Sequence, residues 1–329
     1  MTELGLINIP FESFAMWLLA ILILLGIALL YFGGECLTKG ASSMALRLRI
    51  NPVVVGLTVV SIATSMPELV TSLIAVFDGE SDLAMGNIVG SNLANIGLIL
   101  GVGAVVFPLS IQNRLLIVEN PVLLAVSILF VLLCAGGLGQ TDGLILLAVM
   151  AVCLFLLVKF ARVGGSSGSE EDLEGAKSLG HSVVLVAAGS LLLTLGARVL
   201  VGSSVEVAER FQVSKELIGL TMVAVGTSLP ELAATIVAAA RKESDLIAGN
   251  IIGSNFFNIV LIGGTVSLLK PIAVADSFFT FEFPIMILAT VLMWLFFGIG
   301  KRVSRLDGVL LLIFYCLVIG FRMSQEFGG

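Results

Sequence analysis

Long apolar runs, separated by short polar segments, fill almost the whole chain. A helix needs about 20 predominantly apolar residues to cross a bilayer, and ten runs approach or exceed that length. They lie at residues 14–34, 52–77, 82–107, 115–135, 141–160, 182–205, 216–240, 245–270, 279–299 and 306–322. We expect the first and sixth to continue as long helices to about Arg47 and Arg210. The pattern predicts an all-α polytopic membrane protein with ten transmembrane helices.

The composition agrees with a membrane setting. Hydrophobic residues make up 58% of the chain and charged residues 12%, with a mean hydropathy of +1.14, whereas a typical soluble domain has about 25% charged residues. The apolar runs are continuous rather than alternating, which excludes a membrane β-barrel. Residues 1–13 carry no Lys or Arg, so we expect the first run to stay as a span rather than to be cleaved as a signal peptide.

The chain contains an internal duplication. Residues 56–101 align with residues 219–264 without a gap, at a constant offset of 163, and 25 of the 46 positions are identical. Each copy belongs to a set of five predicted spans. Because five is odd, the second copy enters the membrane from the opposite side, which predicts two inverted five-helix repeats. We assign residues 1–160 to the first repeat, 161–180 to a short linker and 181–329 to the second repeat.

The basic residues predict an orientation in the membrane. With ten spans, one side of the membrane carries 12 Lys and Arg residues, and the side that holds both termini carries 4. An excess of Lys and Arg marks the cytoplasmic side. Both termini should therefore be extracellular or periplasmic, and the 161–180 linker should be cytoplasmic.

Each copy places a proline and a glutamate inside a predicted span. Pro67 and Pro230 lack an N–H group and clash with the carbonyl four residues earlier, so each should kink or break its helix. In the first copy this frees the carbonyl of Ala63, which at membrane depth must face protein or a cavity. Glu68 and Glu231 are costly in a membrane, and such residues mark an ion pathway by default. The duplication predicts a midplane site between the two repeats.

Further polar side chains accompany the two glutamates. Helical spacing places hydroxyl groups three and four residues before each glutamate on its face of the helix. In the next span a serine and an asparagine, four residues apart, share a face. These candidates are Thr64, Ser65, Ser91 and Asn95 in the first copy and Thr227, Ser228, Ser254 and Asn258 in the second. Asn87 and Asn250 are further candidates, with hydrogen bonding between helices as the alternative role.

All of these candidate groups bind through oxygen. Ca²⁺ takes 6–8 oxygen ligands, whereas zinc and copper favour Cys or His. The single histidine, His181, lies at the edge of a span, and the four cysteines form no CxxC pair. Two ionised glutamates are neutralised by one Ca²⁺ or by two Na⁺. Competition between these loads for one pair of carboxylates is a simple physical basis for exchange.

The duplicated segments resemble the alpha-repeats of sodium/calcium exchangers in the cation/calcium antiporter superfamily, of the prokaryotic type without a regulatory domain. The matching motifs are G-x-T-x-x-x-x-x-T-S-x-P-E at 56–68 and 219–231, and G-N-x-x-G-S-N-x-x-N at 86–95 and 249–258. The resemblance implies a ten-helix inverted-repeat fold. In it the second, third, seventh and eighth helices form the ion site, and the first and sixth slide against that core.

The resemblance also implies roles for single residues. Glu68 and Glu231 would ligate Ca²⁺ and Na⁺, with oxygens from the Thr-Ser pair before each break and from the Ser and Asn of the following span. The backbone carbonyl groups of Ser61 and Ala224 would contribute as well. Family members that depend on K⁺ rely on an acid at the position of Asn258, so K⁺ co-transport is not expected here. The linker of about 20 residues holds no separate regulatory domain.

These observations predict a secondary active antiporter that exchanges Na⁺ for Ca²⁺ by alternating access in a prokaryotic inner membrane. The alternative is H⁺-coupled Ca²⁺ exchange, in which the glutamates take protons instead of Na⁺, and a cation channel is less favoured. An enzyme is not predicted, because the sequence offers no convincing nucleophile–base pair and no metal motif such as HExxH. The antiporter would lie in a lipid bilayer and transport Ca²⁺ and Na⁺ as its substrates. No cofactor, nucleic acid or partner protein is implied.

Overall fold

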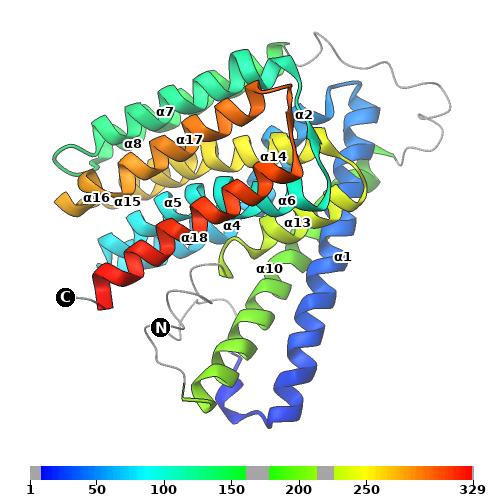
Figure 1. Cartoon of the computed structure of the whole chain (residues 1–329), viewed down its shortest axis with the longest axis vertical. Coiled ribbons are helices and arrows are strands. Elements are labelled where there is room, and N and C mark those ends of the chain that lie inside the picture. Colours follow the sequence, from blue (N-terminus) through cyan, green and yellow to red (C-terminus); the bar gives the residue numbers. More distant parts are fainter. Residues whose placement is uncertain (1–8, 161–177, 213–225, 328–329) are drawn as a thin grey trace.

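The computed structural model describes residues 9–160, 178–212 and 226–327, which form a bundle of helices (Figure 1). In these ranges eight helices are long and apolar enough to cross a membrane, and a bent pair of helices forms a ninth candidate. The structure therefore confirms a mostly helical, multi-pass membrane protein. The predicted 216–240 span lies partly outside the described residues, and its described part contains the apolar helix α13 (Leu229–Ala240).

Residues 9–160 contain the helices of the first five predicted spans, and several of these spans include a short π-helical segment. The elements are η1 (Phe11–Ser13), α1 (Met16–Leu48), α2 (Pro52–Val55), η2 (Gly56–Val60), α3 (Ser61–Thr64), α4 (Met66–Asp78), α5 (Ser81–Ala94), η3 (Asn95–Ile99), α6 (Leu100–Val106), β1 (Leu109–Ser110), η4 (Leu115–Glu119), α7 (Asn120–Leu133) and α8 (Gln140–Phe160). Segment η1 is a 3-10 helix, and η2, η3 and η4 are π-helical. Helix α1 continues through Arg47, as its sequence predicts.

The described part of residues 178–327 contains a similar series of helices, but its short strand lies between the last two helices rather than after the central one. The elements are α10 (Leu179–Arg210), α13, α14 (Ser244–Phe257), η6 (Asn258–Gly263), α15 (Gly264–Leu269), α16 (Asp276–Thr280), α17 (Glu282–Gly298), β2 (Arg302–Val303) and α18 (Arg305–Phe327). Helix α10 ends at Arg210, the predicted limit of the sixth long helix. Segment η6 is π-helical and lies at the position that corresponds to η3.

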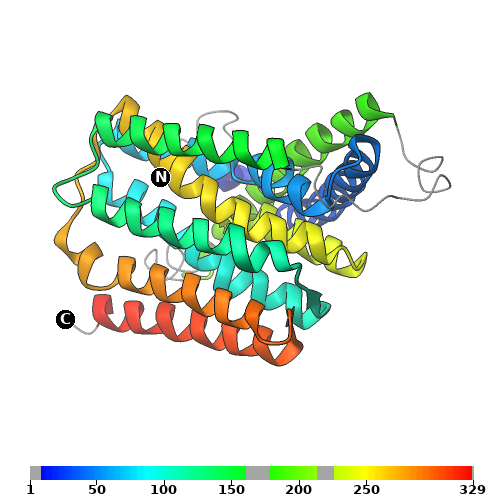
Figure 2. The ribbon, with the colours of Figure 1, turned by 90° about the horizontal axis from the view of Figure 1, so that it is seen from above.

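The centre of the bundle consists of the two helices that carry the second motif. In the most apolar 18-residue stretch of the Ser81–Val106 helix 78% of the residues are buried. In the corresponding stretch of the Ser244–Leu269 helix 89% are buried. In the outer helices α8 and α18 only 11% and 17% of the residues in the corresponding stretches are buried. Their exposed large hydrophobic side chains are leucine, isoleucine, valine and phenylalanine, which suits contact with lipid. Figure 2 shows the red α18 at one edge of the bundle.

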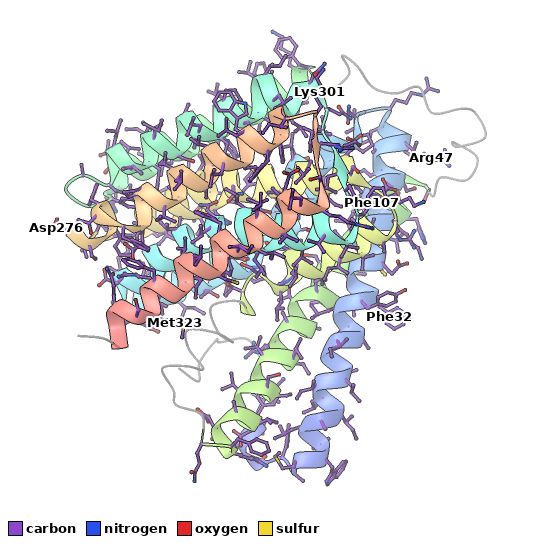
Figure 3. The ribbon with its side chains drawn as sticks, viewed as in Figure 1. Phe32, Arg47, Phe107, Asp276, Lys301 and Met323 are labelled. Carbon is purple, nitrogen blue, oxygen red and sulfur yellow. The ribbon has the colours of Figure 1, made fainter. Side chains whose placement is uncertain are left out.

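Helices α1 and α10 pack against each other and extend away from the rest of the bundle (Figure 1). Glycine permits the close approach at their crossing. A Cβ atom on Gly33 would lie 2.8 Å from the backbone nitrogen of Leu193, and one on Gly196 would lie 2.8 Å from that of Leu30. Small residues let membrane helices approach in this way. Phe32 of α1 projects outward from the molecule (Figure 3) and is 59% exposed, which is compatible with lipid contact.

The last helix in each half of the chain packs against helices of the other half. Helix α8 of the first repeat packs on α15 and η6 of the second, and α18 of the second packs on α6 and η3 of the first. Glycine pairs mark both contacts, because a Cβ on Gly101 would lie 3.1 Å from the Gly308 carbonyl and one on Gly264 would lie 3.2 Å from that of Gly143. Each repeat therefore completes the surface around the other.

Short backbone pairings join the connecting segments. Strands β1 and β2 are antiparallel with Leu109 opposite Val303, and an isolated bridge joins Leu138 to Ile272. Figure 3 shows Phe107 and Lys301, near the first pairing, at one end of the bundle and Asp276, near the second, at the other end. The loops that follow α6 and α15 are therefore each fixed to a loop of the other repeat.

Candidate ion-binding site

The two predicted helix breaks are present and have matching geometry. Ser65 lies between α3 and α4 with φ −83° and ψ 3°, and α4 has Pro67 in its first turn. The helix axis bends by 43° between the two segments. Ser228 has φ −90° and ψ 7°, and α13 starts with Pro230 in its first turn. Proline suits this position because its missing N–H group has no intrahelical partner in a first turn.

Glu68 and Glu231 lie in the first turns of α4 and α13, directly after these breaks. Each is only 1% exposed. The two carboxyl groups are close enough to repel each other when both are charged. The positive end of each helix dipole favours a carboxylate in its first turn, but that effect cannot compensate for two charges buried together. The pair therefore has the electrostatics of a cation site.

Each carboxyl group faces hydroxyl groups from the other repeat. Glu231 faces the side chains of Thr64 and Ser65, and Glu68 faces that of Ser228. Neither carboxylate oxygen of Glu231 has a donor in good hydrogen-bond geometry within the described structure. The two motifs therefore meet across the interface between the repeats, and their hydroxyl oxygens surround the acids without neutralising them.

Buried oxygen atoms without a hydrogen-bond partner in the described structure concentrate at this place. The predicted site residues contribute seven: Ser65 Oγ, Glu68 Oε2, Asn95 Oδ1, Ser228 Oγ, Glu231 Oε1, Glu231 Oε2 and Asn258 Oδ1. An unpaired buried polar atom costs about 1–3 kcal/mol, so native proteins rarely gather several of them without a ligand. The set is all oxygen, as Ca²⁺ and other hard cations require.

The serine and asparagine of the second motif come from the central helices. Asn95 and Asn258 each begin a π-helical segment, η3 and η6 respectively, and single π-helical turns are frequent at functional sites. Asn258 donates from Nδ2 to Ser91 Oγ at 3.0 Å, which links the two repeats directly. Ser91, Asn95, Ser254 and Asn258 are all buried.

Asn87 and Asn250 occupy equivalent sequence positions but have different partners. Asn87 donates from Nδ2 to Ser72 Oγ at 2.8 Å and to the Glu68 carbonyl oxygen at 3.0 Å. The Oδ1 atom of Asn250 accepts hydroxyl groups from Thr64 at 3.4 Å and Ser61 at 3.3 Å, and also from Ser254 at 3.4 Å. Both residues thus form hydrogen bonds between helices beside the acids.

The remaining predicted positions lie at the breaks. The carbonyl oxygen of Ser61 accepts the N–H of Ser65 at 2.9 Å and the Thr64 hydroxyl at 3.4 Å. Thr227 lies in the break before α13 and is half-buried. Ala224 lies outside the described residues.

The carbonyl that Pro67 frees faces protein. Ser190 of α10 donates its hydroxyl to the Ala63 carbonyl oxygen at 2.7 Å. This residue was missed from the sequence, because the equivalent position in the first repeat is Ile27 and no motif marks it. The long helix α10 is therefore hydrogen-bonded to the break that carries Glu68.

Within the described residues no group of three or more His, Cys, Asp and Glu side chains lies close enough together to hold a metal ion. The two glutamates are accompanied only by neutral oxygens at this site, and all four cysteines are free thiols. The geometry fits a hard cation held by two carboxylates and several neutral oxygens.

A family model described as sodium/calcium exchanger protein matches residues 18–159 and 181–324. The chain belongs to this family. It is therefore a membrane antiporter rather than an enzyme. The matched ranges cover both motif copies and all the residues of the candidate site.

Curated relatives match over most of their length. The chain is 33% identical over 302 residues to the putative antiporter CaxA of Alkalimonas amylolytica, covering 89% of this chain and 95% of that relative. It is 33% identical over 285 residues to the inner membrane protein YrbG of Escherichia coli, covering 84% and 88%. It is 32% identical over 341 residues to the sodium/calcium exchanger MaX1 of Methanosarcina acetivorans, covering 90% and 95%.

Solved structures share the fold. The sodium-calcium exchanger NCX_Mj, soaked with 10 mM Na⁺ and 10 mM Sr²⁺, matches with a TM-score of 0.81 at 29% identity, covering 93% of this chain and 99% of that one. The same exchanger soaked with 10 mM Na⁺ and no Ca²⁺ matches with a TM-score of 0.82. This family member therefore has the membrane-exchanger architecture over almost its whole length.

Proposed function

We propose that this protein is a secondary active antiporter that exchanges Na⁺ for Ca²⁺ and binds both ions between Glu68 and Glu231. The observation that carries the proposal is the meeting of two buried acids, one from each motif copy. Together with four other predicted site residues they supply seven buried oxygens that lack hydrogen-bond partners in the described structure, three of them from the acids themselves. The similarity to exchangers whose names specify sodium and calcium supports the choice of ions.

The charge of the site explains why two ions would compete. One Ca²⁺ or two Na⁺ neutralise the pair, and both loads together would leave an excess of positive charge in a low-dielectric interior. A site with both glutamates ionised and no cation is costly at membrane depth. Loaded forms should therefore cross between the two access states more easily than the empty form, which couples one flux to the other.

The proposal includes the inverted-repeat architecture. Ten helices in two oppositely oriented sets, residues 1–160 and 181–329 with a cytoplasmic 161–180 linker, would place the two breaks symmetrically about the membrane midplane. The constant offset of the motifs and the packing of α8 and α18 against the other half of the chain support this arrangement. Both termini would face outward, and the similarity to an inner membrane protein supports a cytoplasmic-membrane location.

The test is Ca²⁺ flux in proteoliposomes under an imposed Na⁺ gradient, with Glu68→Gln and Glu231→Gln. Each substitution keeps the side-chain shape and removes one charge, so each should abolish Na⁺-driven Ca²⁺ uptake. Glu282→Gln is the matched control, because Glu282 is also a membrane-helix acid but pairs with Arg322 in the second repeat. That variant should retain transport.

The same assay separates the coupling ions. Uptake that needs the Na⁺ gradient and survives a protonophore supports Na⁺ coupling. Uptake that follows a pH gradient without Na⁺ would establish H⁺ coupling instead. Saturation of the flux with Ca²⁺ concentration is expected for a carrier, and linear flux without a counter-gradient would indicate a channel. Near-normal exchange in both Gln variants would refute the site.

A further inference from the structure

A small cavity lies one helical turn from Glu231. It has a volume of about 10 Å³ and lies between α1, η2, α13 and α14. Its polar lining consists of Thr38, Thr235 and Asn250, and the rest is apolar, including Leu37 and Ile247. A cavity of this size holds about one water molecule when two or more polar groups line it.

Thr235 is the residue that indicates a bound molecule in this cavity. It is 1% exposed, and its hydroxyl has no hydrogen-bond partner in the described structure. Hydroxyls in membrane helices usually bond to the carbonyl four residues earlier. Thr290 does so at 2.9 Å to Met286, and Ser127 does so at 2.8 Å to Leu123. Thr235 does not form this bond to the carbonyl four residues earlier.

Packing explains the departure. A Cβ atom placed on Gly103 of α6 would lie 2.8 Å from the Cγ2 methyl of Thr235. The methyl therefore occupies the space that Gly103 leaves open, and this contact constrains the side-chain rotamer. The hydroxyl is left without a partner, and Thr235 lines the cavity together with Thr38 and Asn250.

The two residues at the equivalent positions of the first motif copy are in direct contact. Ser72 corresponds to Thr235 and Asn87 to Asn250, at the same offset of 163. There Asn87 donates directly to Ser72 Oγ at 2.8 Å. In the second copy Thr235 lacks that bond, and Thr235 and Asn250 both line the cavity. The same residue positions are thus in direct contact in one copy and line a cavity with room for one water in the other.

We propose that Thr235, Asn250 and Thr38 bind one water molecule that hydrates the cation as it reaches or leaves Glu231 on this side. Thr235 follows Glu231 by four residues on α13 and therefore lies on the same face, one turn along. Ca²⁺ and Na⁺ must exchange water for protein oxygens on entry, and one ordered water beside the acid provides a step between the two. This inference rests on the proposed transport function, but the water itself does not.

The test compares Thr235→Val with Thr235→Ser in the intact protein. If the cavity is dry, valine removes an orphan hydroxyl and should raise the thermal unfolding midpoint. If a water bridges the cavity, valine deprives it of a partner and should lower the midpoint by about 2 °C, while serine keeps it close to the wild type. Ser72→Ala should lower the midpoint in either case, since it removes one of the two acceptors of Asn87 Nδ2.

Transport adds the second readout. Thr235→Val should slow Ca²⁺ exchange roughly fivefold relative to the wild type, the effect of losing one hydrogen bond. Thr235→Ser keeps the hydroxyl and should exchange Ca²⁺ at close to the wild-type rate. A raised unfolding midpoint in Thr235→Val would overturn the water site. A lowered midpoint with unchanged exchange would overturn its place on the ion path, while loss of exchange in Glu231→Gln would still uphold the proposed function.

Discussion

Ser190 and Ala63 are joined by a hydrogen bond of 2.7 Å between the Ser190 hydroxyl and the Ala63 carbonyl oxygen. Pro67 cannot donate to this carbonyl, because it has no N–H group. The acceptor lies just before the break that carries Glu68, and the donor lies on α10, one of the two long helices that extend from the bundle. The proline break thus creates an attachment point for a helix of the other repeat.

Ser190→Ala should weaken this attachment. It leaves the Ala63 carbonyl without its donor from α10, which should lower the free energy of unfolding by about 1 kcal/mol. Thermal unfolding in detergent measures the change. Thr194→Val is the control, because Thr194 donates only along its own helix, to the Ser190 carbonyl at 2.9 Å. An equal loss in both variants would contradict a special role for the contact between α10 and the break.

Ca²⁺ should stabilise the protein only while both acids are present. A ligand that binds only the folded state, at a free concentration 100 times its Kd, adds about 2.7 kcal/mol to the free energy of unfolding. Wild-type protein should therefore unfold at a higher temperature in Ca²⁺ than in chelator, and Glu231→Gln should show little difference. Mg²⁺ at the same concentration is the control, since it dehydrates reluctantly. Full Ca²⁺ protection in Glu231→Gln would show that the ion binds elsewhere.

Gly249→Ala should disrupt the packing of α14 on the first repeat. Its Cβ atom would lie 2.5 Å from the Val53 carbonyl oxygen and 3.0 Å from the Leu57 backbone nitrogen, and backbone cannot move aside easily. Overpacking of this kind costs about 1–3 kcal/mol, so we expect a lower yield of folded protein and a lower unfolding midpoint. Gly320→Ala serves as control, because no described atom lies within 4 Å of its added Cβ. Equal behaviour of the two variants would argue against this contact.

Glu35 should connect α1 to the end of α13. It pairs with Arg241, whose Nε lies 2.9 Å from Glu35 Oε1, and with Lys39 of its own helix, also at 2.9 Å. Because these side chains are partly exposed, Glu35→Gln should lower the free energy of unfolding by no more than about 1 kcal/mol. Lys39→Gln should have a smaller effect, since it leaves the Arg241 pair intact. The difference between the variants should shrink in 1 M KCl, and a salt-independent loss would rule out an ionic origin.

Much of this architecture could be predicted from local chemistry. The limits of α1 and α10 follow from the lengths of the apolar stretches and the glycine-rich sequence after them. The breaks at Ser65 and Ser228 follow from Pro67 and Pro230, because a missing N–H group acts on the same helix turn wherever that turn lies. The duplication predicted candidate site residues in pairs, since both copies carry the same acid after the same break.

Other features depend on which helices cross, and no local pattern specifies that. Ser190 looks like an ordinary helix serine until α10 meets Ala63, and its equivalent Ile27 gives no hint. Thr235 becomes an unpaired hydroxyl only because its methyl packs against Gly103 on a different helix. The sequence by itself determined the spans, the breaks and the paired acids, because those arise from interactions within a few residues. Only the tertiary structure decided their partners, because residues far apart in the chain meet only when the helices pack.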